Sequence, residues 1–139
     1  HYAIFLLKYN AIMKNDTKNG IETHRYASGQ KLSEGLWMNG QKEGVWTEWY
    51  ENGQIKSQES YKENVWHGKH NYWYETGQKM KESIDIDGLY EGAWLTWYEN
   101  GQKWEEGNYF KEMKVGLWTK WDENGQIISQ ENYKDGKLI

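Results

Sequence analysis

The sequence contains no cysteine and no proline among its 139 residues. The lack of cysteine excludes a disulfide framework, thiol catalysis and any metal site built on thiolates. The lack of proline means that no β-ladder loses a backbone donor, so tight turns have to be made by other residues. Fifteen glycines are available for those turns.

Aliphatic residues are scarce, and the mean hydropathy is −1.11. Ten Trp and eleven Tyr take their place, against two Phe. Trp and Tyr combine a broad apolar ring with a polar edge, which suits half-buried positions on the face of a sheet. A chain this rich in aromatic residues does not have the composition of a disordered segment. The composition therefore favours a thin all-β protein without a conventional two-layer core.

No basic stripe is present, and acidic and basic residues alternate along the chain to a net charge of −4. Nucleic acids attract basic patches, and so do the surfaces of anionic membranes. We therefore expect no nucleic-acid partner, and we regard a membrane partner as the weaker alternative to a protein.

The chain repeats every 24 residues without an insertion. Five columns keep this step. They are Gly20, Gly44, Gly68, Gly92 and Gly116; Gly29, Gly53, Gly77, Gly101 and Gly125, each followed by Gln; Trp49, Trp73, Trp97 and Trp121; Tyr26, Tyr50, Tyr74 and Tyr98; and Glu34, Gln58, Glu82, Glu106 and Gln130. Columns in register over this length identify a tandem array. We expect one continuous domain of five repeats, 20–43, 44–67, 68–91, 92–115 and 116–139.

Each repeat has the pattern of a β-hairpin. In residues 44–61, Asn52-Gly53 is the dipeptide preferred in a two-residue turn, and aromatic and β-branched residues precede it. This turn predicts that Trp46 pairs with Glu59 on one face, where Tyr61 covers Gly44. We call this the Trp46 face. On the opposite Trp49 face, Trp49 would pair with Lys56, and Trp73, Trp97 and Trp121 would likewise have Met80, Trp104 and Ile128 beside them. The connectors 62–67, 86–91 and 110–115 are expected to be loops.

The expected fold is thus an all-β, elongated, single-layer antiparallel sheet of tandem 24-residue β-hairpins. Residues 1–19 contain the only apolar run, at 2–7, which is too short for a membrane span. We expect these residues to form a degenerate capping repeat, with the remnant of a targeting segment as the alternative. Two localisations are therefore considered. The protein would be cytoplasmic if it is an antitoxin, and exported if the apolar run is the remnant of a targeting segment.

A single-layer sheet cannot bury both faces, so part of its aromatic surface has to remain open. We expect the Trp46 face to be the packed side and the Trp49 face to bind a partner, because exposed aromatic patches commonly mark interaction sites. The Glu/Gln column has two interpretations, cross-strand hydrogen bonds or an acidic rim for a basic partner. The candidate partner-binding residues are Trp49, Trp73, Trp97, Trp121, Trp104, Glu82, Glu106 and Ile128.

Motifs for catalysis are missing. No Gly-x-Ser-x-Gly elbow and no phosphate-binding loop occurs in the sequence. Asp85 and Asp87 are interpreted as solvated loop charges, and His70 as a polar substitute for Trp. We therefore predict no catalytic, cofactor-binding or metal-binding residue, no cofactor and no enzymatic activity.

The pattern GxWxxWYENGQxxxxExxYxxGxxxG resembles the MORN repeat, and more closely its longer bacterial variant, over residues 20–139. The resemblance implies hairpins laid side by side in one elongated, twisted sheet that serves as a binding scaffold. Similar bacterial proteins include antitoxins and immunity proteins of polymorphic toxin systems. Eukaryotic relatives are associated with phospholipids, membrane junctions and dimerisation. A basic toxin is accordingly the expected partner, with a structural or dimerisation scaffold and a phospholipid-binding module as alternatives.

The strand at 127–133 begins with Ile127-Ile128 and carries Glu131 as its only charge. An unpaired edge strand is a template for another strand. We expect this C-terminal edge to pair with a partner segment or with a second copy of the chain.

Overall fold

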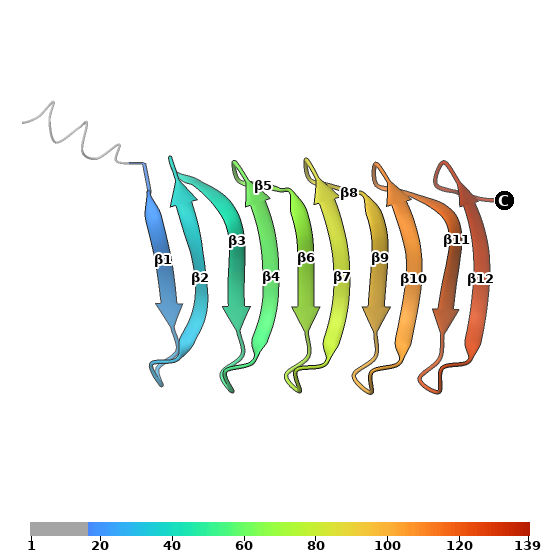
Figure 1. Ribbon diagram of the computed structural model, residues 1–139, viewed down its shortest axis with the longest axis horizontal. Helices are drawn as coiled ribbons and strands as arrows, with labels where there is room; N and C mark the ends of the chain where they lie inside the picture. Colours follow the sequence, from blue (N-terminus) through green and yellow to red (C-terminus); the bar gives the residue numbers. More distant parts are fainter. Residues whose placement is uncertain (1–16) are drawn as a thin grey trace, which may run out of the picture.

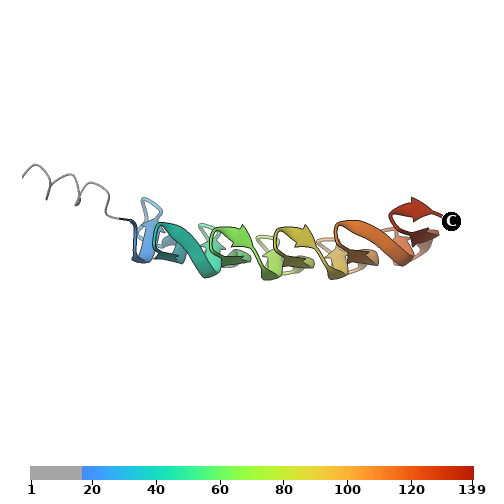
Figure 2. The same cartoon turned by 90° about the horizontal axis from the view of Figure 1, so that it is seen from above.

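The computed structural model describes residues 17–139, which form one open antiparallel sheet without a helix (Figure 1). Seen from above, the molecule is one sheet deep along its length (Figure 2). The all-β, single-sheet prediction is confirmed. The strands are β1 (Gly20–Arg25), β2 (Lys31–Met38), β3 (Gln41–Trp49), β4 (Ile55–Lys62), β5 (Val65–Trp66), β6 (Gly68–Trp73), β7 (Lys79–Ile86), β8 (Leu89–Tyr90), β9 (Gly92–Trp97), β10 (Lys103–Phe110), β11 (Met113–Trp121), β12 (Ile127–Lys134) and β13 (Lys137–Leu138). The proposed capping repeat lies largely outside the described residues.

The turn around Asn52-Gly53 is not the two-residue turn that the dipeptide predicts. Gly53 has a φ of 87°, but Asn52 is not in the positive-φ region. The Gly53 N–H donates to the Tyr50 carbonyl at 3.0 Å, and the Tyr50 N–H donates to the Gln54 carbonyl at 2.8 Å. These bonds define a three-residue loop that ends in a left-handed glycine.

This loop changes the register next to it. The pairs Gly44–Tyr61, Trp46–Glu59 and Thr47–Gln58 form as predicted, but Trp49 pairs with Ile55. Lys56 is the extra residue of a β-bulge, so the predicted Trp49–Lys56 pair is wrong. The same shift recurs in the following repeats, where Met80, Trp104 and Ile128 are the bulge residues that have no partner in the register.

The connectors at the opposite end of the sheet are tight turns, so the prediction of loops is wrong there. Both central residues have positive φ, as type I′ hairpin turns require. The five turns are Asn39-Gly40, Glu63-Asn64, Asp87-Gly88, Lys111-Glu112 and Asp135-Gly136. Strand pairing continues directly on both sides of each turn, through β5 and β8 for example.

Each repeat is attached to the next at both ends of its strands. At the Asn-Gly end, a tyrosine hydroxyl donates to the carbonyl of the tryptophan that lies 23 residues later. These bonds are Tyr26–Trp49 and Tyr50–Trp73 at 2.7 Å, Tyr74–Trp97 at 2.8 Å and Tyr98–Trp121 at 2.9 Å. At the type I′ end, a turn N–H donates to a carbonyl 22 residues earlier, for example Asn64 to Lys42 at 2.9 Å. The axes of the strands accordingly stay nearly aligned with one another along the molecule (Figure 1).

The Trp46 face is the better packed of the two, as expected. Trp118 is 2% exposed, and Ser57, His70, Ser83, Asp85 and Thr96 on the same face are also buried. The predicted cover of Gly44 by Tyr61 is wrong, because a Cβ at Gly44 would meet no atom within 4 Å. The covered glycines are instead Gly35, under the Trp46 ring, and Gly107, under the Trp118 ring.

The two covered glycines lead to a steric prediction. A Cβ at Gly107 would lie 2.2 Å from the Trp118 ring, so Gly107→Ala has to displace a side chain that is only 2% exposed. We expect a loss of about 1–3 kcal/mol in the free energy of unfolding, measured by urea denaturation. Ser83 occupies the same position one repeat earlier, and Ser83→Ala should cost less than ~1 kcal/mol. Equal losses for the two variants would contradict this fit between ring and glycine.

Candidate functional site

Four tryptophans form a regular row on the Trp49 face. Trp49, Trp73, Trp97 and Trp121 stand at the ends of β3, β6, β9 and β11, and all four are half-buried. Equivalent residues are two strands apart, which corresponds to ~9.6 Å. Among residues 17–139, none of the four rings contacts another aromatic ring, in contrast to the rings of the Trp46 face. We call this row the Trp ladder.

Lysine–glutamate pairs lie over most of the ladder. Lys79 pairs with Glu82 at 2.7 Å, and its ammonium is 4.8 Å from the centre of the Trp73 ring. Lys31 and Lys103 lie in the same way over Trp49 and Trp121, paired with Glu34 and Glu106. No lysine lies over Trp97 within the described part of the chain.

These pairs change the interpretation of the Glu/Gln column. Glu82 and Glu106 do not present free carboxylates, because each is neutralised by a lysine of its own strand. Two members of the column form cross-strand hydrogen bonds with a threonine: Thr23 donates to Glu34 at 2.9 Å, and Gln130 donates to Thr119 at 3.4 Å. The column is therefore polar but close to neutral.

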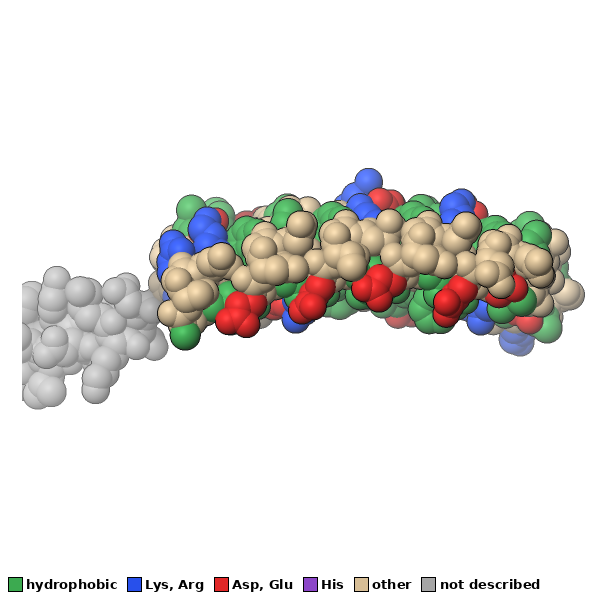
Figure 3. Space-filling view, turned by 90° about the horizontal axis from the view of Figure 1, so that it is seen from below, with side chains coloured by type: hydrophobic (Ala, Val, Ile, Leu, Met, Phe, Trp, Pro, Cys, Tyr) green, Lys and Arg blue, Asp and Glu red, His purple; other side chains and the backbone are tan. Residues whose placement is uncertain are grey.

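The acidic surface lies instead on the turns beside the ladder. Glu51, Glu75, Glu99 and Glu123 each follow a ladder tryptophan by two residues, and all four are exposed. None of them forms an ion pair with another residue of the described chain. Figure 3 looks onto this edge and shows acidic side chains in a row along it. We call this row the turn glutamates. The sequence analysis missed them, although their 24-residue spacing was visible.

The bulge places Trp104 and Ile128 differently from the prediction. Both were expected beside the ladder, whereas Lys103 and Ile127 are the residues opposite Trp97 and Trp121. Trp104 packs against Tyr98 at a centroid distance of 5.7 Å and is 47% exposed. Ile128 occupies the same bulge position and is 62% exposed.

The aromatic row of the Trp46 face is covered by the protein's own lysines. The Lys81 ammonium lies 4.1 Å from the centre of the Trp94 ring and also approaches Tyr72 and Tyr90. Lys42 covers Trp46 and Tyr61, and Lys114 covers Trp118 and Tyr133. Such contacts shield the ring faces with methylene stems and a cation. Rings of this face are thus covered both by lysines and by one another, whereas the ladder rings have lysines over three of the four and no ring contacts.

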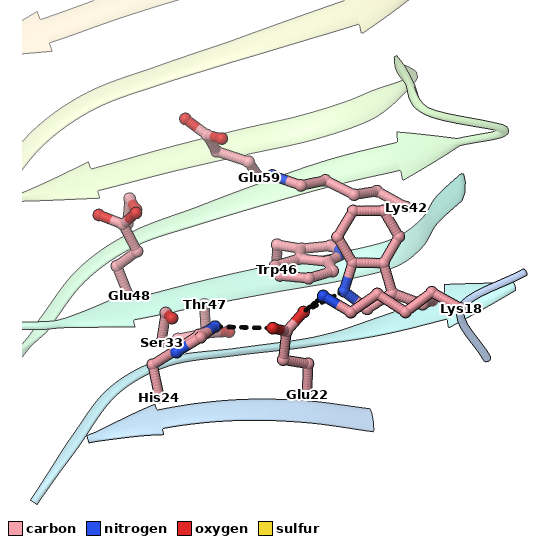
Figure 4. A pocket seen from close by; sticks show the side chains of 11 residues that line it. Lys18, Glu22, His24, Ser33, Lys42, Trp46, Thr47, Glu48 and Glu59 are labelled. Atoms are coloured by element: carbon pink, nitrogen blue, oxygen red, sulfur yellow. Dashed lines mark hydrogen bonds and ion pairs between the residues drawn. The ribbon is translucent and has the colours of Figure 1, made fainter. Parts of the chain in front are cut away.

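A cavity of about 310 Å³ opens on the Trp46 face near β1 (Figure 4). Glu22 lies at its centre and accepts bonds from Lys18 at 2.8 Å and from the Trp37 indole, while the His24 ring lies 2.8 Å away. The Lys18 bond and then the Trp37 bond lower the pKa of Glu22 to about 2. On the far wall, Glu59 accepts hydrogen bonds from the hydroxyls of Tyr61 and Tyr72.

The charges of this cavity balance one another. Lys18 lies over the Trp37 ring, Lys42 lies over the Trp46 ring, and Glu48 approaches Lys56 at 3.6 Å. The three carboxylates of the cavity, Glu22, Glu48 and Glu59, therefore each have a hydrogen-bond or ion-pair partner.

His70 and Asp85 come together beneath the same face, although the sequence analysis treated them separately. They are 0% and 1% exposed, so the interpretation of Asp85 as a solvated charge is wrong. His70 occupies the position that Trp46 has one repeat earlier, as expected, and its ring centre lies 4.8 Å from that of Trp66. Its Nε2 is 3.5 Å from Asp85 Oδ2, and neither ring nitrogen of His70 forms a hydrogen bond within the described structure.

Both members of the pair favour their neutral forms. Burial lowers the pKa of His70. Burial also raises the pKa of Asp85, and the nearby Glu112 raises it further. Two departures from the pattern in a single repeat, on paired strands, are the sequence signal that could have revealed this contact.

Other site types are not found between residues 17 and 139. No group of three or more His, Asp or Glu side chains is arranged to hold a metal ion there. That part of the chain also has no helix of the length and apolarity needed to cross a membrane.

The buried pair leads to a prediction about pH. The pKa of Asp85 is above its ordinary value of 3.8 in the fold, so its ionisation destabilises the fold as the pH rises through that range. Asp85→Asn removes this cost. It should raise the free energy of unfolding by about 1–3 kcal/mol at neutral pH, and the gain should disappear toward pH 3. Urea denaturation at both pH values measures it.

The matched control is Asp87→Asn, two residues away, where the aspartate side chain is 85% exposed. We expect little change from that variant at either pH. If Asp85→Asn instead destabilised the protein at neutral pH, His70 and Asp85 would be an ion pair, and the neutral assignment would be wrong.

Comparison with known proteins places this geometry in a family context. Residues 42–63, 90–111 and 114–135 each match the MORN repeat variant, and each match contains one hairpin of the sheet. The copy that would begin 24 residues after the first match, at Trp66, contains both His70 and Asp85 and is not matched. A search of curated proteins found no match. Three hairpins of the chain therefore match the MORN repeat variant, and MORN repeats are a non-enzymatic repeat module that forms scaffolds.

Proposed function

We propose that this chain is a non-catalytic scaffold that binds a protein partner with a basic surface. The observation that carries the proposal is the row of four unpaired turn glutamates beside the half-buried Trp ladder. Tryptophan supplies contact area, and uncompensated carboxylates at the rim steer a partner of opposite charge.

The two faces differ in what they leave available. Rings of the Trp46 face contact one another and lie under Lys42, Lys81 and Lys114. Lysines also lie over Trp49, Trp73 and Trp121 of the ladder, but the ladder rings make no mutual contacts, and Trp97 has no lysine over it within residues 17–139. Binding at the ladder therefore has to move lysine side chains but leaves the ring packing of the opposite face intact.

An antitoxin or immunity protein that covers a basic toxin is the specific form of this function that we favour. Its support is the resemblance of the sequence to such proteins, together with the acidic turn edge. A phospholipid surface is the weaker alternative, because acidic turns beside the ladder would be repelled by anionic headgroups.

Neutralising the turn glutamates tests the proposal. A variant in which Glu51, Glu75, Glu99 and Glu123 are all replaced by Gln should bind the partner at least about tenfold more weakly at low salt. The difference should shrink as salt is added, because exposed charges are screened. The partner is sought first among the products of neighbouring genes and is then titrated as a purified protein by calorimetry.

The control carries Glu63→Gln and Asp135→Asn, which remove carboxylates from turns at the opposite edge of the sheet. It should bind like the unmodified chain. Two results would overturn the proposal: a partner that ignores the quadruple variant at every salt concentration, or flotation of the chain with anionic liposomes in the absence of any protein partner.

A second contact through the C-terminal edge is also proposed. Tyr133 and Lys134 are covered by β13, and the Ile139 N–H donates to the Asn132 carbonyl. Within the described residues, the outer side of β12 from Ile127 to Glu131 has no strand beside it. This segment can pair with a partner strand or with a second copy of the chain.

A lysine at the bulge tests that edge. Ile128→Lys should lower the mass measured by light scattering if copies pair there, or weaken partner binding if a partner strand does. The fold should survive, because Ile128 is 62% exposed. An unchanged mass together with unchanged binding would show that the edge is inert.

A further inference from the structure

We propose that the segment of the partner that lies on the Trp ladder is a basic, proline-rich stretch in the polyproline II conformation, with one turn of the ligand for each repeat of the sheet. This inference rests on the proposed function, because it names the kind of protein segment that the ladder takes. The period of the ladder, the constant step between repeats and the turn glutamates each carry one part of it.

The first part is a match of periods. Equivalent tryptophans are two strands apart, or ~9.6 Å. A polyproline II helix has three residues per turn and rises about 3.1 Å per residue, so its turns repeat at ~9.3 Å. The difference accumulates to only about 1 Å from Trp49 to Trp121, which side chains absorb.

Other peptide conformations fit the ladder less well. An α-helix repeats every ~5.4 Å, and a strand presents the same face every ~6.7 Å, so neither keeps pace with the tryptophans. A bound strand also needs free backbone donors and acceptors, which a sheet offers at its edge and not on its face. Polyproline II makes no internal hydrogen bonds and needs none from its receptor, and aromatic-lined surfaces are its usual docking sites.

The second part is the constant step from one repeat to the next. Sheets of many strands usually twist, which would wind the ladder around the long axis. Here the strands stay nearly aligned (Figure 1), and the sheet as a whole only bows gently (Figure 3). The bonds from Tyr50 to Trp73 and from Tyr74 to Trp97 recur with nearly constant length, so successive tryptophans are related by the same step. A polyproline II segment is semi-rigid over several residues and can follow such a shallow arc.

The third part is charge. Of the three residues in each ligand turn, one that points toward the turn edge would approach a turn glutamate, and these have the same period as the tryptophans. Lysine or arginine at every third position therefore matches Glu51, Glu75, Glu99 and Glu123, while proline at the other two faces the indole rings. The ladder lysines add no uncompensated positive charge, because Lys79 and Lys103 are neutralised by Glu82 and Glu106, but their side chains have to move off the ring faces for proline to pack there.

Synthetic peptides test the proposal on the chain as it exists. The probe repeats Pro-Pro-Lys over about 18 residues, enough for ~6 turns of polyproline II. One control repeats Gly-Ser-Lys at the same length and charge, and a second keeps the composition of the probe but clusters its lysines at one end. Binding is measured by calorimetry and by the change in tryptophan fluorescence. We expect the probe to bind at least about tenfold more tightly than either control.

Variants of the chain locate the binding. Trp97→Ala and the double variant Glu75→Gln, Glu99→Gln should each weaken the probe about tenfold or more. Trp104→Ala removes an exposed tryptophan of the same repeat that lies in the bulge, off the ladder, and should leave binding unchanged. Circular dichroism and thermal unfolding confirm that each variant is folded.

The outcomes separate this inference from the function on which it rests. Equal binding of the probe and the Gly-Ser-Lys peptide would show that charge alone is recognised, so the polyproline conformation would be wrong while a basic partner would stand. Equal binding of the clustered peptide would reject the one-turn-per-repeat arrangement. Absence of binding to any peptide would overturn the inference, and titration of the intact partner would still decide the proposed function. Loss of binding in Trp104→Ala but not in Trp97→Ala would move the site off the ladder.

Discussion

The structure depends on hydrogen bonds that tie each repeat to the next at both ends of its strands. A single-layer hairpin has no interior of its own, so its stability comes from its neighbours. The Tyr50 hydroxyl reaches the carbonyl of Trp73, and the Asn64 N–H reaches the carbonyl of Lys42. Side-chain ladders of this kind limit the twist of a sheet of many strands. The regular spacing of the tryptophans and of the turn glutamates is a result of that limited twist.

Much of the fold could be predicted from the sequence, because a repeated pattern fixes its own period. The strands, their antiparallel order and the inner pairs such as Trp46–Glu59 follow from alternation and from the position of the turn. The type of the turn at Asn52-Gly53 could not be predicted in this way. Asn52-Gly53 suits a two-residue turn, but the Asn52 side chain donates to the Glu75 carbonyl of the next repeat at 2.9 Å. That contact belongs to the array and is invisible in a single hairpin. Conversely, Glu63-Asn64 has little of a turn signal and adopts two positive φ angles.

The candidate site was predicted in part. The ladder followed from the spacing alone, but its surroundings depended on one bulge residue in each repeat. That bulge places Lys79 and Lys103 opposite the ladder where Met80 and Trp104 were expected. Ion pairs of those lysines then neutralise Glu82 and Glu106 and leave the turn glutamates as the acidic surface. His70 and Asp85 were also predicted only in part. Each replaces the usual residue of its own 24-residue column, and comparing positions within one column does not reveal that the two side chains meet across paired strands.

The glycines beneath Trp46 and Trp118 have a consequence for how such an array can change over generations. The ring and the residue beneath it belong to different copies: Gly107 precedes the copy that contains Trp118. The fit between ring and glycine therefore depends on which two copies are adjacent. Recombination that deleted residues 92–115 would place Trp118 beside Ser83, where Trp94 now donates its N–H to Glu105 at 3.1 Å. Copies with the same period are therefore not interchangeable, and unequal crossing-over between them is opposed by the packing of the junction it would create.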